Sequence, residues 1–252
     1  MTVDGDKKNT DTIFVKPDNT IKKVFKNILP IYLVNSLLKL KLTYLDKYID
    51  YILYKVIKNF FLKFSHPVYK KIPVKHSSCL YSLNQFLSKT KNFDYDFFLT
   101  AGSLLGSIRQ ESFAGRPTDV DLGIIETKAD VFLKDLNEMD KTGISRIDKF
   151  YDDENLLTRV QILLLGELID VSIFRPHISN NVRYWKGEYD ENSKSIDKYI
   201  YIEHKNLISL TNCQLYGFNY LSPSNPERYL ENKFGANWRI PNKKQFMWNK
   251  KI

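Results

Sequence analysis

The chain has 252 residues and a net charge of +9, and 43% of its residues are hydrophobic while 27% are charged. This length and balance predict a globular protein with a substantial buried core, and they exclude disordered and fibrous classes. The two cysteines, Cys79 and Cys213, have neither the number nor the spacing of a disulfide scaffold or a zinc knuckle, which favours a reducing compartment.

The N-terminal third of the chain is predicted to contain two segments. Residues 1–20 are polar and are expected to be loose. Residues 21–75 form a basic segment, in which nine lysines between residues 21 and 64 are balanced only by Asp46 and Asp50. Apolar residues recur there at helical spacing, which predicts two or three amphipathic helices.

Two interpretations of the basic segment stay open. Its helices lie on an anionic membrane surface, or they pack on the rest of the protein with their lysines in water. The charge is concentrated in this apolar segment, so we expect no nucleic-acid partner. The longest uncharged run, residues 27–38, is shorter than the roughly 20 residues that span a bilayer. The N-terminus also lacks the order of a signal peptide, so we expect a cytoplasmic protein, with peripheral attachment to the inner membrane face as the alternative.

Beyond the basic segment, strands and helices alternate, which predicts a mixed α/β (α+β) domain over residues 76–252. A helix over residues 128–141 is expected to bury Val131, Leu136 and Met139. The last helix is expected to begin at the N-cap Asn225 and to stop at Gly235. The other expected elements are a helix over residues 74–90, a strand at 96–100, a helix over 103–110, a strand at 119–125, and two strands between 156 and 174 joined at Gly166.

A turn made of Gly102 and Ser103 joins the strand at residues 96–100 to the next helix, and we call it the Gly-Ser turn. It presents backbone N–H groups at a helix N-terminus, where anions bind. Every arginine lies after residue 100, although the chain is rich in lysine throughout. Arginine grips phosphate with two parallel hydrogen bonds, which lysine cannot do, so some of these arginines are expected at a phosphate site.

Three aspartates follow the Gly-Ser turn. Asp119 and Asp121 are two residues apart in a predicted strand, so their side chains project from the same face. They repel each other unless a cation lies between them, and Mg²⁺ is bound in proteins by carboxylate oxygens. Asp170 is a lone acid in an otherwise apolar strand, where it is costly to bury without a partner. Together the three acids predict a metal site.

The stretch GSLLGSIRQESFAGRPTDVDLGI, residues 102–124, resembles the LicD and fukutin branch of the nucleotidyltransferase fold. In that branch a Gly-small-Leu-Leu-Gly-x-x-Arg stretch leads at this spacing into Asp-x-Asp. The closing stretch GFNYLSPSNPERYLENKFGANWRIP, residues 217–241, is also similar to the branch's ending. The resemblance covers residues 93–241. It implies a nucleotidyltransferase-like mixed sheet flanked by helices.

The chain differs from LicD-type members just before its Asp-x-Asp motif. Those members carry a run of acids there, whereas this chain has Arg116, Pro117 and Thr118. In this it is more similar to the fukutin subgroup. The difference favours a phospho-polyol over phosphocholine as the transferred group.

The resemblance implies transfer of ribitol-phosphate, glycerol-phosphate or phosphocholine from a CDP-linked donor, with release of CMP. The acceptor would be a hydroxyl of a glycan or of a lipid-linked or surface polysaccharide. The acids Asp119, Asp121 and Asp170 would hold Mg²⁺ or Mn²⁺, and Asp170 could also accept the proton of the incoming hydroxyl. The expected donor-binding residues are Gly102, Ser103, Arg109 and Arg159.

Two alternatives use the same fold. A nucleotidyltransferase would attack the α-phosphate of an NTP to modify a small molecule or sugar phosphate, and it would release pyrophosphate. A non-catalytic, membrane-associated assembly module would need no acids at all. Because all three acids are present, the sequence favours an enzyme.

Overall fold

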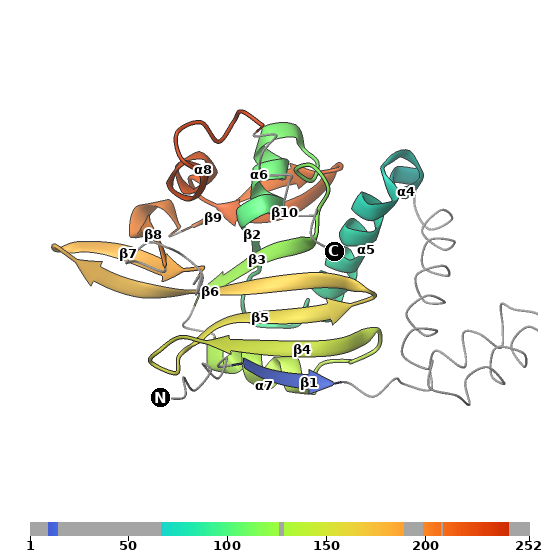
Figure 1. Ribbon diagram of the computed structural model, residues 1–252, viewed down its shortest axis with the longest axis horizontal. Helices are drawn as coiled ribbons and strands as arrows, with labels where there is room; N and C mark the ends of the chain where they lie inside the picture. Colours follow the sequence, from blue (N-terminus) through green and yellow to red (C-terminus); the bar gives the residue numbers. More distant parts are fainter. Residues whose placement is uncertain (1–9, 15–66, 126–128, 189–198, 208, 242–252) are drawn as a thin grey trace, which may run out of the picture.

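The computed structural model describes residues 10–14, 67–125, 129–188, 199–207 and 209–241 (Figure 1). These residues form a mixed α/β fold in which helices flank one central sheet, so the predicted fold class is confirmed. Of the predicted basic segment, residues 21–75, positions 21–66 lie outside the described residues, and the remainder contains a short helix (Pro67–Lys71) and the first residues of the helix that starts at Val74. No helix in the described part of the chain is long and apolar enough to cross a membrane.

The main path of the sheet runs β1-β4-β5-β6-β3-β2-β10-β9. Strands β3 and β6 are parallel, as are β2 and β10, and the other neighbours are antiparallel. Strand β6 is long enough to continue into a hairpin with β7, which pairs with β8. The strands are β1 (Thr10–Phe14), β2 (Phe98–Leu99), β3 (Asp119–Ile125), β4 (Ile144–Tyr151), β5 (Leu157–Leu164), β6 (Glu167–Ser179), β7 (Val182–Gly187), β8 (Ile200–Glu203), β9 (Leu210–Leu215) and β10 (Phe218–Pro223).

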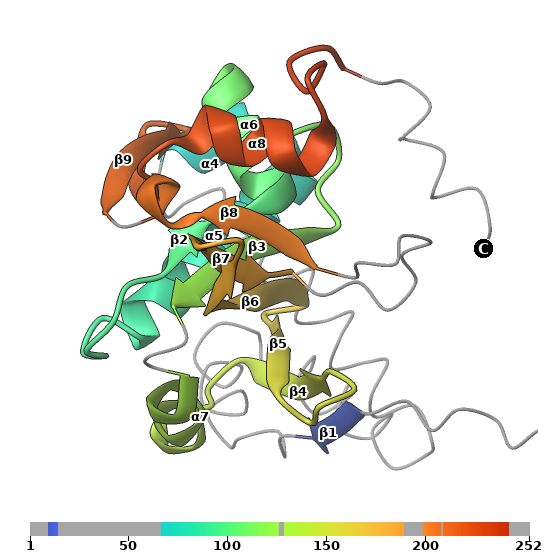
Figure 2. The same cartoon turned by 90° about the vertical axis from the view of Figure 1, so that its left-hand side faces the viewer.

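The helices pack on both sides of this sheet. Figure 2 shows α6 and α8 side by side, and the two helices are in contact. Helix α5 lies on the other face, where Lys75 and Ser78 bind the buried carboxylate of Glu167. The helices are α4 (Pro67–Lys71), α5 (Val74–Lys89), α6 (Ala101–Gln110), α7 (Ala129–Glu138) and α8 (Pro226–Phe234), with a short 3₁₀ helix, η2 (His204–Asn206).

The two faces of the sheet differ in chemistry where β4, β5, β6 and β3 run side by side. Side chains alternate along a strand, so residues paired across strands share a face. One face is apolar and buried, with Ile147, Val160, Ile162, Ile169 and Val171. The opposite face carries a polar row in register across the four strands, made of Asp148, Gln161, Asp170 and Asp121.

Local sequence signals explain the ends of α6 and α8. Asn225 caps α8 by accepting a hydrogen bond from the backbone N–H of Arg228 at 3.1 Å, and the helix ends at Gly235, whose φ is +83°, as predicted. In α6, a Cβ on Gly106 would lie 2.2 Å from the carbonyl oxygen of Ser112. Only glycine therefore lets the chain fold back against α6 after it ends.

The structure corrects two expectations. Within the predicted loose N-terminus, residues 10–14 form β1, which pairs with β4 along its length. A β-branched and aromatic sequence of this kind suits a strand, and it covers an edge of the sheet that would otherwise be unpaired. In α7, Val131 is 41% exposed and Phe132 is buried instead. Phe132 and Leu136 are four residues apart, so they share the inward face that Val131 misses.

Candidate active site

The three predicted acids lie on the neighbouring strands β3 and β6. Asp121 and Asp170 are directly paired residues of these parallel strands, and Asp119 begins β3 two residues before Asp121. Both acids of β3 therefore share a face with Asp170, as predicted. Asp170 is buried at 9% exposure, whereas Asp119 and Asp121 are half-buried, so the cluster lies at the boundary between the core and the solvent.

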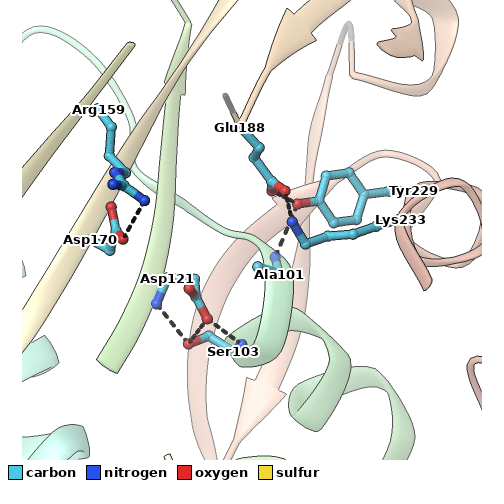
Figure 3. A network of polar contacts seen from close by, with 8 residues as sticks. All are labelled: Ala101, Ser103, Asp121, Arg159, Asp170, Glu188, Tyr229 and Lys233. Atoms are coloured by element: carbon cyan, nitrogen blue, oxygen red, sulfur yellow. Dashed lines mark hydrogen bonds and ion pairs between the residues drawn. The ribbon is translucent and has the colours of Figure 1, made fainter. Parts of the chain in front are cut away.

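The Gly-Ser turn binds Asp121 directly (Figure 3). The Asp121 carboxylate accepts hydrogen bonds from the backbone N–H of Ser103 at 3.1 Å and from its hydroxyl at 3.4 Å. The backbone N–H of Asp121 donates in turn to the Ser103 hydroxyl at 2.9 Å. A Cβ on Gly102 would lie 3.2 Å from the same carboxylate oxygen. The first turn of α6 thus fixes an acid of the cluster, and its expected binding of phosphate stays a prediction.

Asp170 is held through one of its two oxygens. The Gln161 amide donates to Oδ2 at 3.0 Å, and an Arg159 guanidinium nitrogen lies 3.7 Å from the same atom. Arg159 is itself positioned by the ring of Phe150, whose centroid is 4.3 Å from the guanidinium carbon. The other oxygen, Oδ1, is buried and has no hydrogen-bond partner in the described part of the protein. It is therefore the atom of Asp170 that a cation or a substrate proton could use.

Burial makes these carboxylates costly to ionise. Desolvation raises the pKa of Asp121 well above its usual value, and repulsion from Asp119 and Asp170 adds to the effect. Desolvation also raises the pKa of Asp170 to about 6, although Arg159 and Gln161 oppose the shift. Such a cluster favours the binding of a cation.

A second group of side chains adjoins the acids and was not predicted as a site (Figure 3). The backbone N–H of Ala101 donates to the Tyr229 hydroxyl at 3.0 Å, and that hydroxyl donates to one carboxylate oxygen of Glu188. The ammonium of Lys233 pairs with the other oxygen of Glu188. Glu188 raises the pKa of both Asp121 and Asp170, whereas Lys233 lowers the pKa of Asp121.

The sequence contains only a weak signal for this group. Tyr229 and Lys233 are four residues apart in a predicted helix, and this spacing places two side chains on one face. Glu188 directly follows a strand, and no sequence pattern around it indicates a functional residue.

The chemistry of the site fits a divalent cation. Among the described residues, no three His, Cys, Asp or Glu side chains are gathered as closely as metal ligands are. However, Asp170 keeps one buried oxygen without a partner. The site also carries more negative than positive charge. Two cations, Arg159 and Lys233, act on Asp121 and Asp170. The acids outnumber them, since Asp119 and Glu188 add their charges to those of the two aspartates. Mg²⁺ and Mn²⁺ prefer carboxylate oxygens as ligands, and a site with more carboxylates than cations provides them.

The two predicted donor-binding arginines lie in different places. Arg159 is beside Asp170 on the polar face of the sheet. Arg109 lies in the last turn of α6, six residues beyond Ser103. Six residues of helix correspond to about 9 Å along the axis. The structure therefore brings Arg159 to the acids and places Arg109 toward the other end of α6, and the role of each in donor binding stays a prediction.

Comparisons with known proteins locate the chain in one family. The crystal structure of the lincosamide antibiotic adenylyltransferase LnuA, with lincomycin bound, is similar at 9% identity and a TM-score of 0.39, over 66% of this chain and 91% of that one. None of the curated proteins matches the sequence. The family described as LicD/FKTN/FKRP, nucleotidyltransferase domain, matches residues 94–225, which include all three acids and the Gly-Ser turn. The match covers more than half of the chain and supports a transferase, and the protein therefore belongs to the LicD/FKTN/FKRP family.

Proposed function

We propose that the protein is a metal-dependent phosphotransferase that uses a CDP-linked donor and releases CMP. It moves a phospho-polyol, either ribitol- or glycerol-phosphate, or a phosphocholine group to a hydroxyl of a glycan or surface polysaccharide. Family membership supports transfer chemistry. The observation that carries the proposal is the direct pairing of Asp121 with Asp170 beside the first turn of α6.

The acids Asp119, Asp121 and Asp170 would hold Mg²⁺ or Mn²⁺. A bound cation supplies positive charge to the donor's pyrophosphate and to the CMP that departs. The chain's own residues keep the acids in position, since Ser103 fixes Asp121 and Gln161 fixes Asp170. Arg159 contributes a second positive charge next to Asp170, where a donor phosphate would lie.

The transfer itself exchanges one phosphorus–oxygen bond for another. The oxygen of the acceptor hydroxyl bonds to the donor phosphorus nearest the transferred group, and the bond from that phosphorus to the CMP oxygen breaks with its electron pair. Oδ1 of Asp170 is the oxygen that neither Gln161 nor Arg159 occupies. It would take the hydroxyl proton when the metal is held by Asp119 and Asp121, and the proton would pass to water when Oδ1 ligates the metal instead.

The sequence before the Asp-x-Asp motif narrows the transferred group. Arg116, Pro117 and Thr118 occupy the place of the acids found in LicD-type members, as in the fukutin subgroup. A phospho-polyol is therefore preferred to phosphocholine.

A panel of donors tests this function. The purified protein is incubated with a glycan acceptor and with CDP-ribitol, CDP-glycerol, CDP-choline or labelled NTPs, and mass spectrometry identifies the products. We expect CMP and a phosphorylated glycan from a CDP-linked donor. Pyrophosphate and a nucleotidylated product from an NTP would instead identify a nucleotidyltransferase. Turnover of none of these donors by the folded protein would favour a non-catalytic assembly module.

A further inference from the structure

The geometry points to Lys233 as a further catalytic residue, whose ammonium contacts a phosphate of the donor, with Glu188 and Tyr229 as its positioning residues. The inference rests on the proposed function for the identity of the donor. The role of Lys233 requires only that a diphosphate binds in the site, whatever group the diphosphate carries. The inference and the proposed function can therefore fail separately.

Lys233 lies at the edge of the acid cluster. It extends from α8, and its side chain is 21% exposed, whereas that of its partner Glu188 is 5% exposed. Although burial alone would lower the pKa of Lys233, Glu188, Asp121 and Asp170 together raise it. The ammonium therefore pairs with Glu188 and lies within the electrostatic reach of Asp121 and Asp170, two of the acids that are proposed to bind the metal.

The contacts of Lys233 are tied to the first turn of α6. Ala101 and Glu188 both have left-handed backbones, with φ of +40° and +53°, although neither is glycine. The Tyr229 hydroxyl joins these two positions by bonding to the backbone of Ala101 and to the carboxylate of Glu188. A left-handed backbone is unfavourable for residues other than glycine, and positions of this kind are retained where geometry matters for function. The network therefore fixes Lys233 relative to the turn that binds Asp121.

An ammonium in this place can serve a diphosphate. Lysine is a compact charge that binds phosphate without demanding a particular orientation. Glu188 keeps the ammonium beside the acids, and its single negative charge is shared with the Tyr229 hydroxyl. When a donor binds, Lys233 offsets negative charge on the phosphate that leaves with CMP, which is where charge develops during transfer.

A double variant separates catalysis from folding. Replacing Lys233 alone would leave the buried charge of Glu188 without its cation, which destabilises a protein. Lys233→Met combined with Glu188→Gln removes both charges, and the new amide can still accept from Tyr229. The matched control is Arg228→Gln with Glu231→Gln, an exposed ion pair at 2.7 Å on the same helix. It makes the same change in charge away from the acids.

Binding of inorganic pyrophosphate in the presence of Mg²⁺, measured by calorimetry beside thermal unfolding, tests the inference. We expect the double variant to bind at least about tenfold more weakly than the wild type, as loss of a charged hydrogen bond predicts. The control variant should bind pyrophosphate like the wild type. The single variant Lys233→Arg, which keeps the positive charge, should bind it more tightly than the double variant does.

Equal pyrophosphate binding by the double variant would overturn the inference, as would a wild type that binds no pyrophosphate. Turnover of CDP-linked donors is then measured separately. If the wild type binds pyrophosphate through Lys233 but uses no CDP-linked donor, the proposed function fails and the inference stands. If a CDP-linked donor is used and the double variant retains the wild-type kcat, the inference fails and the function stands.

Discussion

Asp121 and Asp170 lie side by side on parallel strands, but different elements of the fold bind their carboxylates. Asp121 accepts from Ser103 in the first turn of α6, and Asp170 accepts from Gln161 on β5. Each acid is therefore positioned by a neutral donor, and the two repel each other across the strand boundary. This arrangement fixes the geometry of the acids, and because Arg159 and Lys233 balance only part of their charge, the remainder is left to a ligand.

Asp170→Asn should stabilise the protein when no metal is bound. The folded-state pKa of Asp170 is about 6, above the ordinary 3.8, so the folded protein binds more protons between these pH values and loses stability as the pH rises through them. At neutral pH the ionised Asp170 therefore lowers the free energy of unfolding by about 3 kcal/mol at most, and the asparagine avoids this cost. Thermal unfolding in chelator at pH 4 and pH 7 should show the variant's advantage at pH 7 and little difference at pH 4. An asparagine variant that is less stable than the wild type at pH 7 would mean that the charge of Asp170 holds the fold together.

Gly102→Ala should lower activity without lowering stability. Alanine is favoured over glycine in a helix by about 1 kcal/mol, and Gly102 lies in the first turn of α6. Its Cβ, however, would crowd the Asp121 carboxylate at 3.2 Å. We expect an unchanged or slightly higher Tm and a fall of about tenfold in kcat, because a small displacement of a catalytic group is costly.

Gly106→Ala is the contrasting variant for the same measurement. Its Cβ would meet the backbone of Ser112 at 2.2 Å, so the fold itself should be destabilised. A Gly102→Ala variant with full activity would show that the position of the Asp121 carboxylate is not critical.

Arg159→Lys should weaken donor binding. The substitution keeps the charge beside Asp170 but removes the planar group that stacks on Phe150 and can grip a phosphate with two nitrogens. The expected cost is about 1.5–3 kcal/mol, measured as donor affinity beside thermal stability.

Arg109→Lys is measured in parallel, because Arg109 lies in the last turn of α6. A loss of donor affinity there equal to that of Arg159→Lys would extend the donor site along α6. If Arg159→Lys lowers Tm and leaves donor affinity unchanged, Arg159 is a structural ion-pair residue.

The part of the basic segment that precedes residue 65 is predicted to bind anionic membranes. Each lysine near such a surface contributes about 1 kcal/mol, so several give reversible binding that weakens with salt. In co-sedimentation, the protein should pellet with anionic vesicles and less so at high salt or when five lysines become glutamine, namely Lys22, Lys23, Lys26, Lys39 and Lys41. Equal recovery in the supernatant with anionic and neutral vesicles at low salt would favour helices that cap the protein.

The sequence predicted those parts of the fold that depend on local signals. Helix α8 has its N-cap and its terminal glycine in the chain itself, and β3 has an uninterrupted strand pattern. The strand β1 was missed because its polar neighbours suggested a loose segment, whereas pairing with β4 decides its structure. A strand of this kind is stabilised by its partner more than by its own residues.

The acids of the candidate site were predictable from the sequence, and the residues that surround them were not. Asp119 and Asp121 share a face because the period of a strand is two, and Asp170 stood out as an acid among apolar residues. Glu188 and Lys233 are 45 residues apart, and only the packing of α8 near the end of β7 brings them together. The binding of Asp121 by Ser103 was also missed, since the same backbone N–H would suit a phosphate.

The most direct test of the central claim is CMP release from CDP-linked donors, measured for the wild type with and without chelator and for Asp119→Asn and Asp121→Asn. The account predicts that chelator abolishes release and that added Mg²⁺ or Mn²⁺ restores it. Each variant should lose activity while its Tm stays at or above that of the wild type, because the charges that are removed repel their neighbours in the absence of metal. Full turnover by either variant, or full wild-type activity in chelator, would contradict a metal site built on these acids.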